Sequence, residues 1–131
     1  MKVNIDISIG DFIDRYSILL VKASKITDEV KMEQVIKELQ SHALIYENII
    51  KDMRRSSIYH LESNLASLVE TNTHLWNILD RQRKIEEGYF DPSDFIELSR
   101  CVYKENDHRF KLKKSIDKFF DSDILEQKQY V

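Results

Sequence analysis

Glycine and proline are nearly missing from this chain of 131 residues, which has two glycines and one proline. Neither residue occurs between Asp11 and Glu87. Both disfavour the interior of an α-helix, whereas sheet proteins need them in tight turns. Hydrophobic residues make up 42% of the chain, enough for a core. We therefore predict one all-α domain over 1–131, an antiparallel bundle of about four helices.

Apolar residues recur at steps of three and four, and this period divides the chain into four helices. The predicted ranges are 9–26, 28–55, 57–87 and 92–120, with a polar tail over 121–131. The last three ranges have heptad seams, which indicate heptad-type packing. Gly88 after the third range and Asp91-Pro92 before the fourth are the strongest boundary signals.

The connection between the second and third helices has two interpretations. Between Met53 and Ile58 the apolar seam makes a step of five residues, so its phase does not carry across. This shift favours a tight turn, with Ser57 capping the third helix. The alternative is one continuous helix of about 60 residues, which would be about 90 Å long.

The seam of the fourth helix is interrupted by Glu105 and Arg109. They lie four residues apart with the acid first, the favourable orientation for an ion pair within one helix. Antiparallel helices of the predicted lengths bring this interruption to the level of Asn72, His42 and Asp14. We therefore expect a polar layer halfway up the bundle.

This layer has two interpretations. Buried polar groups can fix the register and oligomeric state of a bundle. Alternatively, the layer binds a small anion, because guanidinium groups bind phosphate and carboxylate bidentately. The candidate ligand-binding residues are Asp14, Arg15, Tyr103, Asn106, Asp107 and Arg109. The sequence assigns no catalytic residue.

Motifs for metal binding and catalysis are weak. A di-iron bundle needs two Glu-x-x-His pairs and two further glutamates, and Glu105 with His108 is the only such pair in the sequence. Neither a nucleophile elbow nor a glycine-rich phosphate loop is present. We expect no metal and no cofactor, and an enzyme is the less favoured class of protein.

Charge and cysteine content limit the partners and the compartment. Charged residues make up 33% of the chain, with both signs mixed and a net charge of −3. Nucleic acid is therefore not an expected partner, since nucleic-acid binders usually carry a basic excess. Cys101 is the single cysteine, and no apolar run is long enough for a membrane span, so we expect neither a signal peptide nor a membrane-spanning helix. We expect a cytoplasmic protein that does not bind membranes.

Three segments form a recognisable pattern: 9–19 (IGDFIDRYSIL), 95–109 (FIELSRCVYKENDHR) and 126–130 (EQKQY). In these segments the chain resembles a family of small helical accessory proteins from bacteria and phages that carry a domain of unknown function. The resemblance covers both ends of the chain and implies no activity. The positions that it implies for the family pattern are Gly10, Asp14, Arg15, Arg100, Tyr103, Asn106, Asp107, Arg109, Glu126, Lys128 and Tyr130.

Two hypotheses for function follow from these patterns. The leading one is a non-enzymatic helical interaction or assembly module that forms a homodimer or binds a protein partner, because the helix over 9–26 is apolar nearly all round. The alternative is a small anionic-ligand binding protein or enzyme that uses the polar layer.

Overall fold

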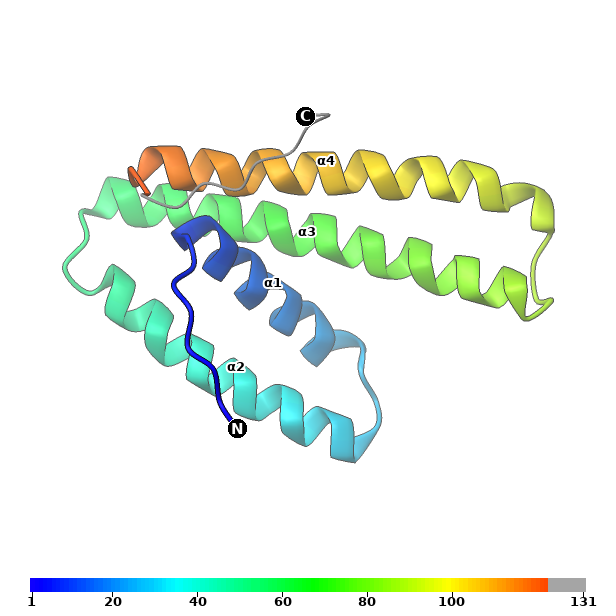
Figure 1. The fold of residues 1–131 in the computed structure, drawn as a ribbon, viewed down its shortest axis with the longest axis horizontal. Helices are drawn as coiled ribbons and strands as arrows, with labels where there is room; N and C mark the ends of the chain where they lie inside the picture. The colour runs from blue at the N-terminus through cyan, green and yellow to red at the C-terminus, as the bar shows by residue number, and fades with distance from the viewer. Residues whose placement is uncertain (123–131) are drawn as a thin grey trace.

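The computed structural model describes residues 1–122, and four α-helices form most of that length (Figure 1). They are α1 (Ile9–Lys25), α2 (Glu29–Ile50), α3 (Arg55–Glu86) and α4 (Phe95–Phe119). The predicted fourth helix begins as a short 3-10 turn, η1 (Pro92–Asp94). No β-strand occurs within residues 1–122, and the all-α prediction is confirmed. Most of the predicted polar tail, residues 123–131, lies outside the described residues.

Local hydrogen bonds place the ends of the helices. The Ser8 hydroxyl accepts a hydrogen bond from the amide of Asp11 (3.0 Å) at the start of α1. The carboxylate of Asp28 does the same for the amide of Lys31 (2.9 Å) at the start of α2. These bonds satisfy amides that have no partner inside the helix. After α3, Gly88 adopts a left-handed conformation with φ of 89°, which ends the helix as expected.

The connection between α2 and α3 is a turn, so one continuous helix is excluded. α2 ends at Ile50, five residues earlier than predicted, and α3 begins at Arg55. Ser57 therefore lies inside α3, and Arg54 occupies the capping position without a side-chain hydrogen bond. Met53 explains the early end of α2, because its side chain folds back against the core and its amide bonds the Ile50 carbonyl (3.1 Å).

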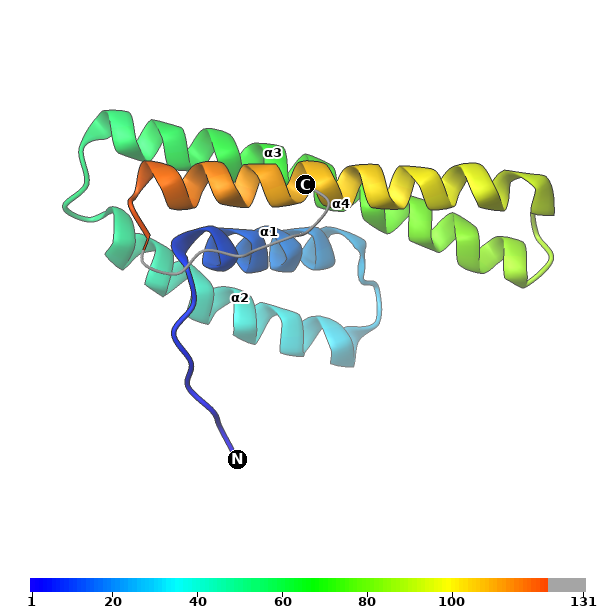
Figure 2. The same ribbon diagram turned by 45° about the horizontal axis from the view of Figure 1, so that its top comes forward.

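α1 is the central helix of the fold. It packs against α2, α3 and α4, while α3 and α4 form a long antiparallel pair (Figure 2). The apolar side chains of α1 are thus at least partly buried within one chain, so the apolar character of this helix alone does not require a second chain. α2 packs mainly against α1, and its one buried residue is Val35. The heptad seam of α2 consequently has a single main partner helix.

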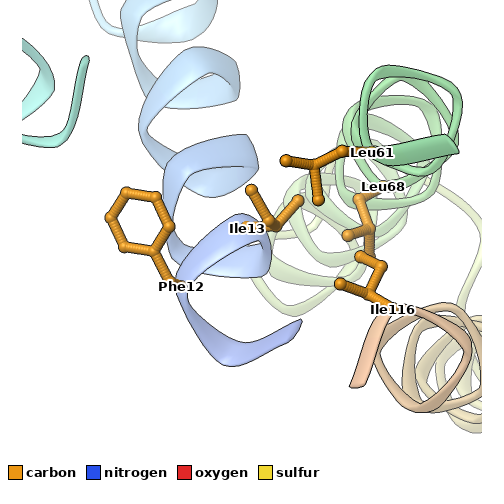
Figure 3. Close-up of a cluster of buried hydrophobic side chains, with 5 residues drawn as sticks. All are labelled: Phe12, Ile13, Leu61, Leu68 and Ile116. Atoms are coloured by element: carbon orange, nitrogen blue, oxygen red, sulfur yellow. The ribbon is translucent and has the colours of Figure 1, made fainter. Parts of the chain in front are cut away.

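The core lies where α1 crosses α3 and α4. Phe12 and Ile13 come from α1, Leu61 and Leu68 from α3, and Ile116 from α4 (Figure 3). Four of these five side chains have no measurable exposure to solvent, and Phe12 has little. Burial of one such side chain stabilises the folded state by about 1.5–3 kcal/mol. This cluster therefore holds α3 and α4 against the N-terminal half of α1.

Beyond the end of α1, the pair of α3 and α4 continues without cover from α1 or α2 (Figure 1). The ammonium group of Lys25 donates a hydrogen bond to the Asn77 side chain (3.0 Å), which marks the level at which α1 ends. We call residues 78–103 the hairpin extension. Ile78 and Ile85 are its buried apolar side chains.

Candidate functional site

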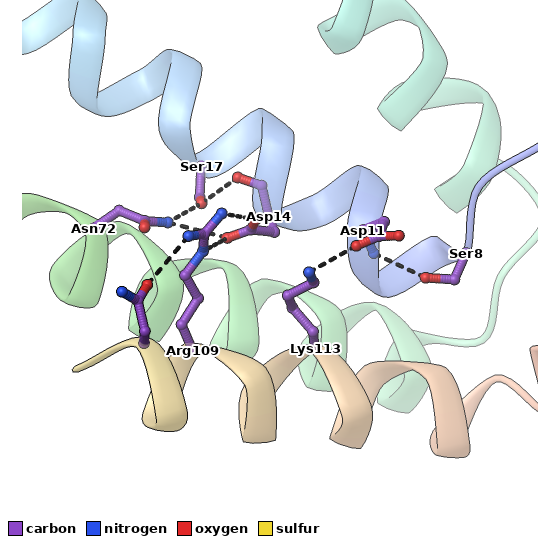
Figure 4. A network of polar contacts seen from close by, with 8 residues as sticks. Ser8, Asp11, Asp14, Ser17, Asn72, Arg109 and Lys113 are labelled. Atoms are coloured by element: carbon purple, nitrogen blue, oxygen red, sulfur yellow. Dashed lines mark hydrogen bonds and ion pairs between the residues drawn. The ribbon is translucent and has the colours of Figure 1, made fainter. Parts of the chain in front are cut away.

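The predicted polar layer forms around an ion pair between α1 and α4. Arg109 Nε donates to Asp14 Oδ1 (2.8 Å), and Arg109 Nη2 donates to Asp14 Oδ2 (2.6 Å) (Figure 4). The side chain of Asp14 is 5% exposed and that of Arg109 is 29% exposed. Two parallel, charge-assisted hydrogen bonds of this kind are strong and fix the orientation of both side chains.

Asn72 of α3 and Ser17 of α1 complete the layer. The amide of Asn72 donates to Asp14 Oδ1 (3.2 Å) and to the hydroxyl of Ser17 (2.8 Å). That hydroxyl in turn donates to the carbonyl oxygen of Asp14 (2.6 Å). Both Asn72 and Ser17 are buried, and Arg109 Nη1 also donates to Asn106 Oδ1 over a longer 3.4 Å. The layer thus joins three helices, and its charged groups bind one another.

The structure brings three of the six candidate residues together, namely Asp14, Asn106 and Arg109. The other three have different surroundings. Arg15 is exposed, because the next residue along a helix points about 100° away from Asp14. Tyr103 is 56% exposed and lies about 9 Å along α4 from Arg109. Asp107 is partly buried and leaves α4 on nearly the opposite side from Arg109.

Glu105 and Arg109 form bonds with different helices. Glu105 Oε1 lies 3.2 Å from His74 Nδ1 of α3, whereas Arg109 forms its bidentate pair with α1. The sequence favoured an ion pair between these two residues of one helix. The buried carboxylate of Asp14 is the stronger partner, because its attraction to a cation is less screened by water.

A second polar contact joins α1 and α4 one turn of α1 before Asp14, and the sequence analysis did not predict it. The amide of Gly10 donates to Asp117 Oδ1 (2.6 Å), and Asp117 is buried. A Cβ atom at position 10 would overlap the Lys113 carbonyl oxygen, so only glycine allows this close approach. The ammonium group of Lys113 pairs with Asp11 Oδ1 (2.7 Å) beside it (Figure 4).

Burial raises the pKa of Asp117, since a carboxylate loses hydration there. Hydrogen bonds from the Gly10 amide and the Ser8 hydroxyl oppose this increase, as does the nearby ammonium group of Lys113, while the Asp11 carboxylate adds to it. Gly10 belongs to the pattern of the sequence resemblance, but no spacing rule pointed to Asp117. Asp117 follows the seam residue Ile116 and is not itself in the seam, so the sequence suggests an ordinary charged surface residue.

A groove of about 290 Å³ lies beside the polar layer, where α1, α3 and α4 meet. Its apolar lining comes from Ile18, Val21, Leu75, Trp76 and Leu79. Asn72, Asn106 and Arg109 border the groove and are also members of the layer. We call this feature the apolar groove. Apolar walls with a few polar groups are the usual lining of a binding site.

The chemistry that the layer can perform is limited by its own pairing. The charge of Arg109 is largely neutralised by Asp14, so the layer offers hydrogen bonds more than net charge. Within residues 1–122, no three histidine, cysteine, aspartate or glutamate side chains are grouped so that they could hold a metal ion. In the same part of the chain, no helix has the length and apolar character needed to cross a membrane.

Comparison with known proteins adds no relative. No protein-family model, curated protein or solved structure matches this chain. The fold and the site are thus defined by the residues of this chain alone, and the family resemblance stays a prediction.

Proposed function

We propose that this protein is a non-enzymatic helical assembly module that forms a homodimer through the apolar groove. The observation that carries the proposal is the position of the groove at the base of the hairpin extension, where α1 stops and α3 and α4 continue. Leu79, at this edge, is an aliphatic residue that remains 41% exposed. Exposed apolar surface next to a groove is typical of protein interaction sites.

A second copy of the chain is the occupant that the shape favours. The hairpin extension supplies two antiparallel helices, and a two-fold axis would supply the same two helices again, which gives a four-helix arrangement. A pocket of about 260 Å³ adjoins the groove and is lined by Trp76, Leu79, Asp80 and Arg83. Asp80 pairs with Lys84 of its own helix (2.9 Å), and in a two-fold interface Arg83 of the second copy can join this pair, with the reverse contact following by symmetry.

The polar layer supports an assembly function rather than a reaction. Its carboxylate and guanidinium groups are occupied by one another, as expected for a layer that fixes the register of α1 against α3 and α4. We propose that the module acts in the cytosol, in keeping with its single cysteine.

Light scattering after size-exclusion chromatography tests the homodimer. The mass measured for the wild-type protein should be twice the chain mass of 15.6 kDa. Leu79→Glu should yield a folded monomer, because it places a charge within the proposed apolar interface. Leu44→Glu is the matched control: Leu44 lies on α2, is 65% exposed, and should tolerate the charge without loss of the dimer. A wild-type monomer at every concentration would contradict the proposal.

A small-molecule site is the second candidate function, favoured by the polar residues that border the apolar groove. Because Asp14 neutralises Arg109, a bound anion would have to share the guanidinium group with that carboxylate. A thermal-shift screen of nucleotides, sugar phosphates and dicarboxylates tests this candidate. A shift that Asn106→Ala abolishes would support it, and no shift with any compound would count against it.

A further inference from the structure

A second groove, of about 550 Å³, lies near the C-terminal end of α4. It is lined by His60 of α3 and by Lys111, Lys114, Ser115, Lys118 and Phe119 of α4. We call it the basic groove. Three lysines and no acidic residue among these lining residues make it locally positive, although the whole chain carries a net charge of −3.

The three lysines lie on the surface of α4, where the ammonium group of Lys114 is 5.8 Å from the centre of the Phe110 ring. Lys111, Lys114 and Lys118 follow steps of three and four, so they lie on one side of α4, and all three are exposed. None of these lysines takes part in an ion pair found within residues 1–122. Elsewhere on the same helix, Arg109 and Lys113 pair with carboxylates of α1. The positive charge of the basic groove is therefore not compensated by direct pairing.

An aromatic wall stands beside the lysines. The rings of His60 and Phe119 stack with their centroids 3.9 Å apart and their planes 12° from parallel. Phe120 packs edge-on against Phe119, with centroids 4.9 Å apart. These contacts hold the ring of Phe119 in place, yet 49% of this residue remains exposed. A fixed, half-exposed ring offers a surface on which a planar group can stack.

We infer that the basic groove binds single-stranded nucleic acid, with the lysines on phosphates and Phe119 against a base. Lysines along a groove together with an exposed aromatic ring are the combination that such proteins use. Lys111 and Lys118 are about 10 Å apart along the helix axis, which spans about three nucleotides. An acidic protein segment would use the lysines alone and leave the ring without a role.

The inference departs from the expectation that nucleic acid is not a partner. That expectation used the net charge of the chain, which averages over the acidic and basic parts of the surface. The fold gathers lysines that the sequence intersperses with other residues of α4, and it adds His60 from a distant part of the chain.

Fluorescence anisotropy with a labelled short oligothymidine tests the inference. The affinity should fall as salt rises, with a slope of log K against log salt of about −2, since each of three neutralised phosphates contributes about −0.7 in a single strand. Replacing Lys111, Lys114 and Lys118 together by alanine should weaken binding at least about tenfold at low salt and bring the slope close to zero. Replacing Lys31 and Lys37 of α2 and Lys51 directly after this helix by alanine removes the same charge from exposed positions and should leave the slope unchanged.

Phe119→Ala separates stacking from charge. It should weaken binding about tenfold, a typical loss for one stacked base, with the salt slope retained. Circular dichroism checks that each variant is folded. Leu79→Glu should bind the oligonucleotide as the wild-type protein does, so that failure of the proposed homodimer and failure of this inference give different results.

Three outcomes would overturn the inference. The first is no binding of oligothymidine at about 50 mM salt. The second is equal binding of polyglutamate that is insensitive to Phe119→Ala, which would assign the groove to an acidic protein segment. The third is tighter binding of duplex DNA than of the single strand, since paired bases cannot stack on Phe119.

Discussion

The two ends of the α3–α4 pair differ in what covers them. At the covered end, α1 lies across both helices, buries Leu61, Leu68 and Ile116, and adds polar contacts through Asp14 and Gly10. In the hairpin extension neither α1 nor α2 covers the same two helices, so among the described helices α3 and α4 pack mainly against each other. One pair of helices therefore combines a region fixed by a third helix with a region that neither α1 nor α2 covers. Four pairs of substitutions test this contrast.

The largest effect is expected at the ion pair of the covered end. Arg109→Ala should lower the free energy of unfolding by about 3–5 kcal/mol, because it leaves the buried carboxylate of Asp14 without its cation. Urea denaturation followed by circular dichroism measures this change. Arg15→Ala, on the exposed side of α1, should change the same quantity by less than about 0.5 kcal/mol. Equal effects of the two substitutions would show that the layer is not structural.

Core truncations compare the apolar packing of the two ends. Leu68→Ala should lower the free energy of unfolding by about 3 kcal/mol, since Leu68 is wholly buried among three helices. Ile85→Ala in the hairpin extension should lower it by about half as much, because two helices can close a cavity more readily than three. A larger loss for Ile85→Ala would contradict the contrast.

The two glycines give the next comparison. Gly10→Ala should lower the free energy of unfolding by about 2 kcal/mol, because its methyl group would push the Lys113 backbone away from α1. Gly88→Ala at the end of the extension meets no atom within 4 Å and should cost only about 1 kcal/mol of backbone strain from its φ of 89°. Thermal unfolding of both variants provides the test, and the reverse order would show that α1 and α4 can separate without loss.

The smallest effects are expected from pH, and they have opposite signs at the two ends. Burial raises the pKa of Asp117 above its usual 3.8, so the folded protein holds this proton more tightly than the unfolded chain does. The contribution of Asp117 to stability is therefore present at low pH and is lost as the pH rises from 3.8 through the folded-state pKa. The stability of the wild type relative to Asp117→Asn should fall over this window.

Asp91, in the loop of the extension, is the matched control. The Ser93 amide donates a hydrogen bond to its carboxylate and lowers its pKa below 3.8. Its contribution is present above 3.8 and is lost as the pH falls through the folded-state pKa. The stability of the wild type relative to Asp91→Asn should therefore fall towards low pH. Urea titrations across acidic pH distinguish the two signs, and the same sign for both would contradict the assignment.

Much of this fold could be predicted from the sequence. Helical periodicity located the four helices, and the antiparallel register placed Asp14, Asn72 and Arg109 at one level, where hydrogen bonds join them. The same register also placed His42 in this layer, but its ring stacks on Phe12 of the core instead, with centroids 5.5 Å apart.

Other features could not be predicted, for physical reasons. The tie between Gly10 and Asp117 uses a backbone amide, which has no signature in the side-chain pattern. The sequence did not show that α2 packs mainly against α1 alone. A heptad seam indicates that a helix has a neighbour, but it does not indicate the number of neighbouring helices. The lysines of the basic groove are recognisable in the sequence as a solvated basic patch, but the groove was not predicted, because it depends on the stacking of His60 of α3 on Phe119 of α4.

The central position of α1 has a consequence for synthesis of the chain. Its hydrogen bonds to Arg109 and Asp117 connect residues 95 and 107 positions apart. Translation therefore delivers α1, the most apolar of the four helices, before α4, which carries two of its polar anchors. Until α4 leaves the ribosome, α1 exposes surface that favours aggregation. A product that stops before α4 should accordingly be insoluble, whereas release of the full chain should let α1 be enclosed at once.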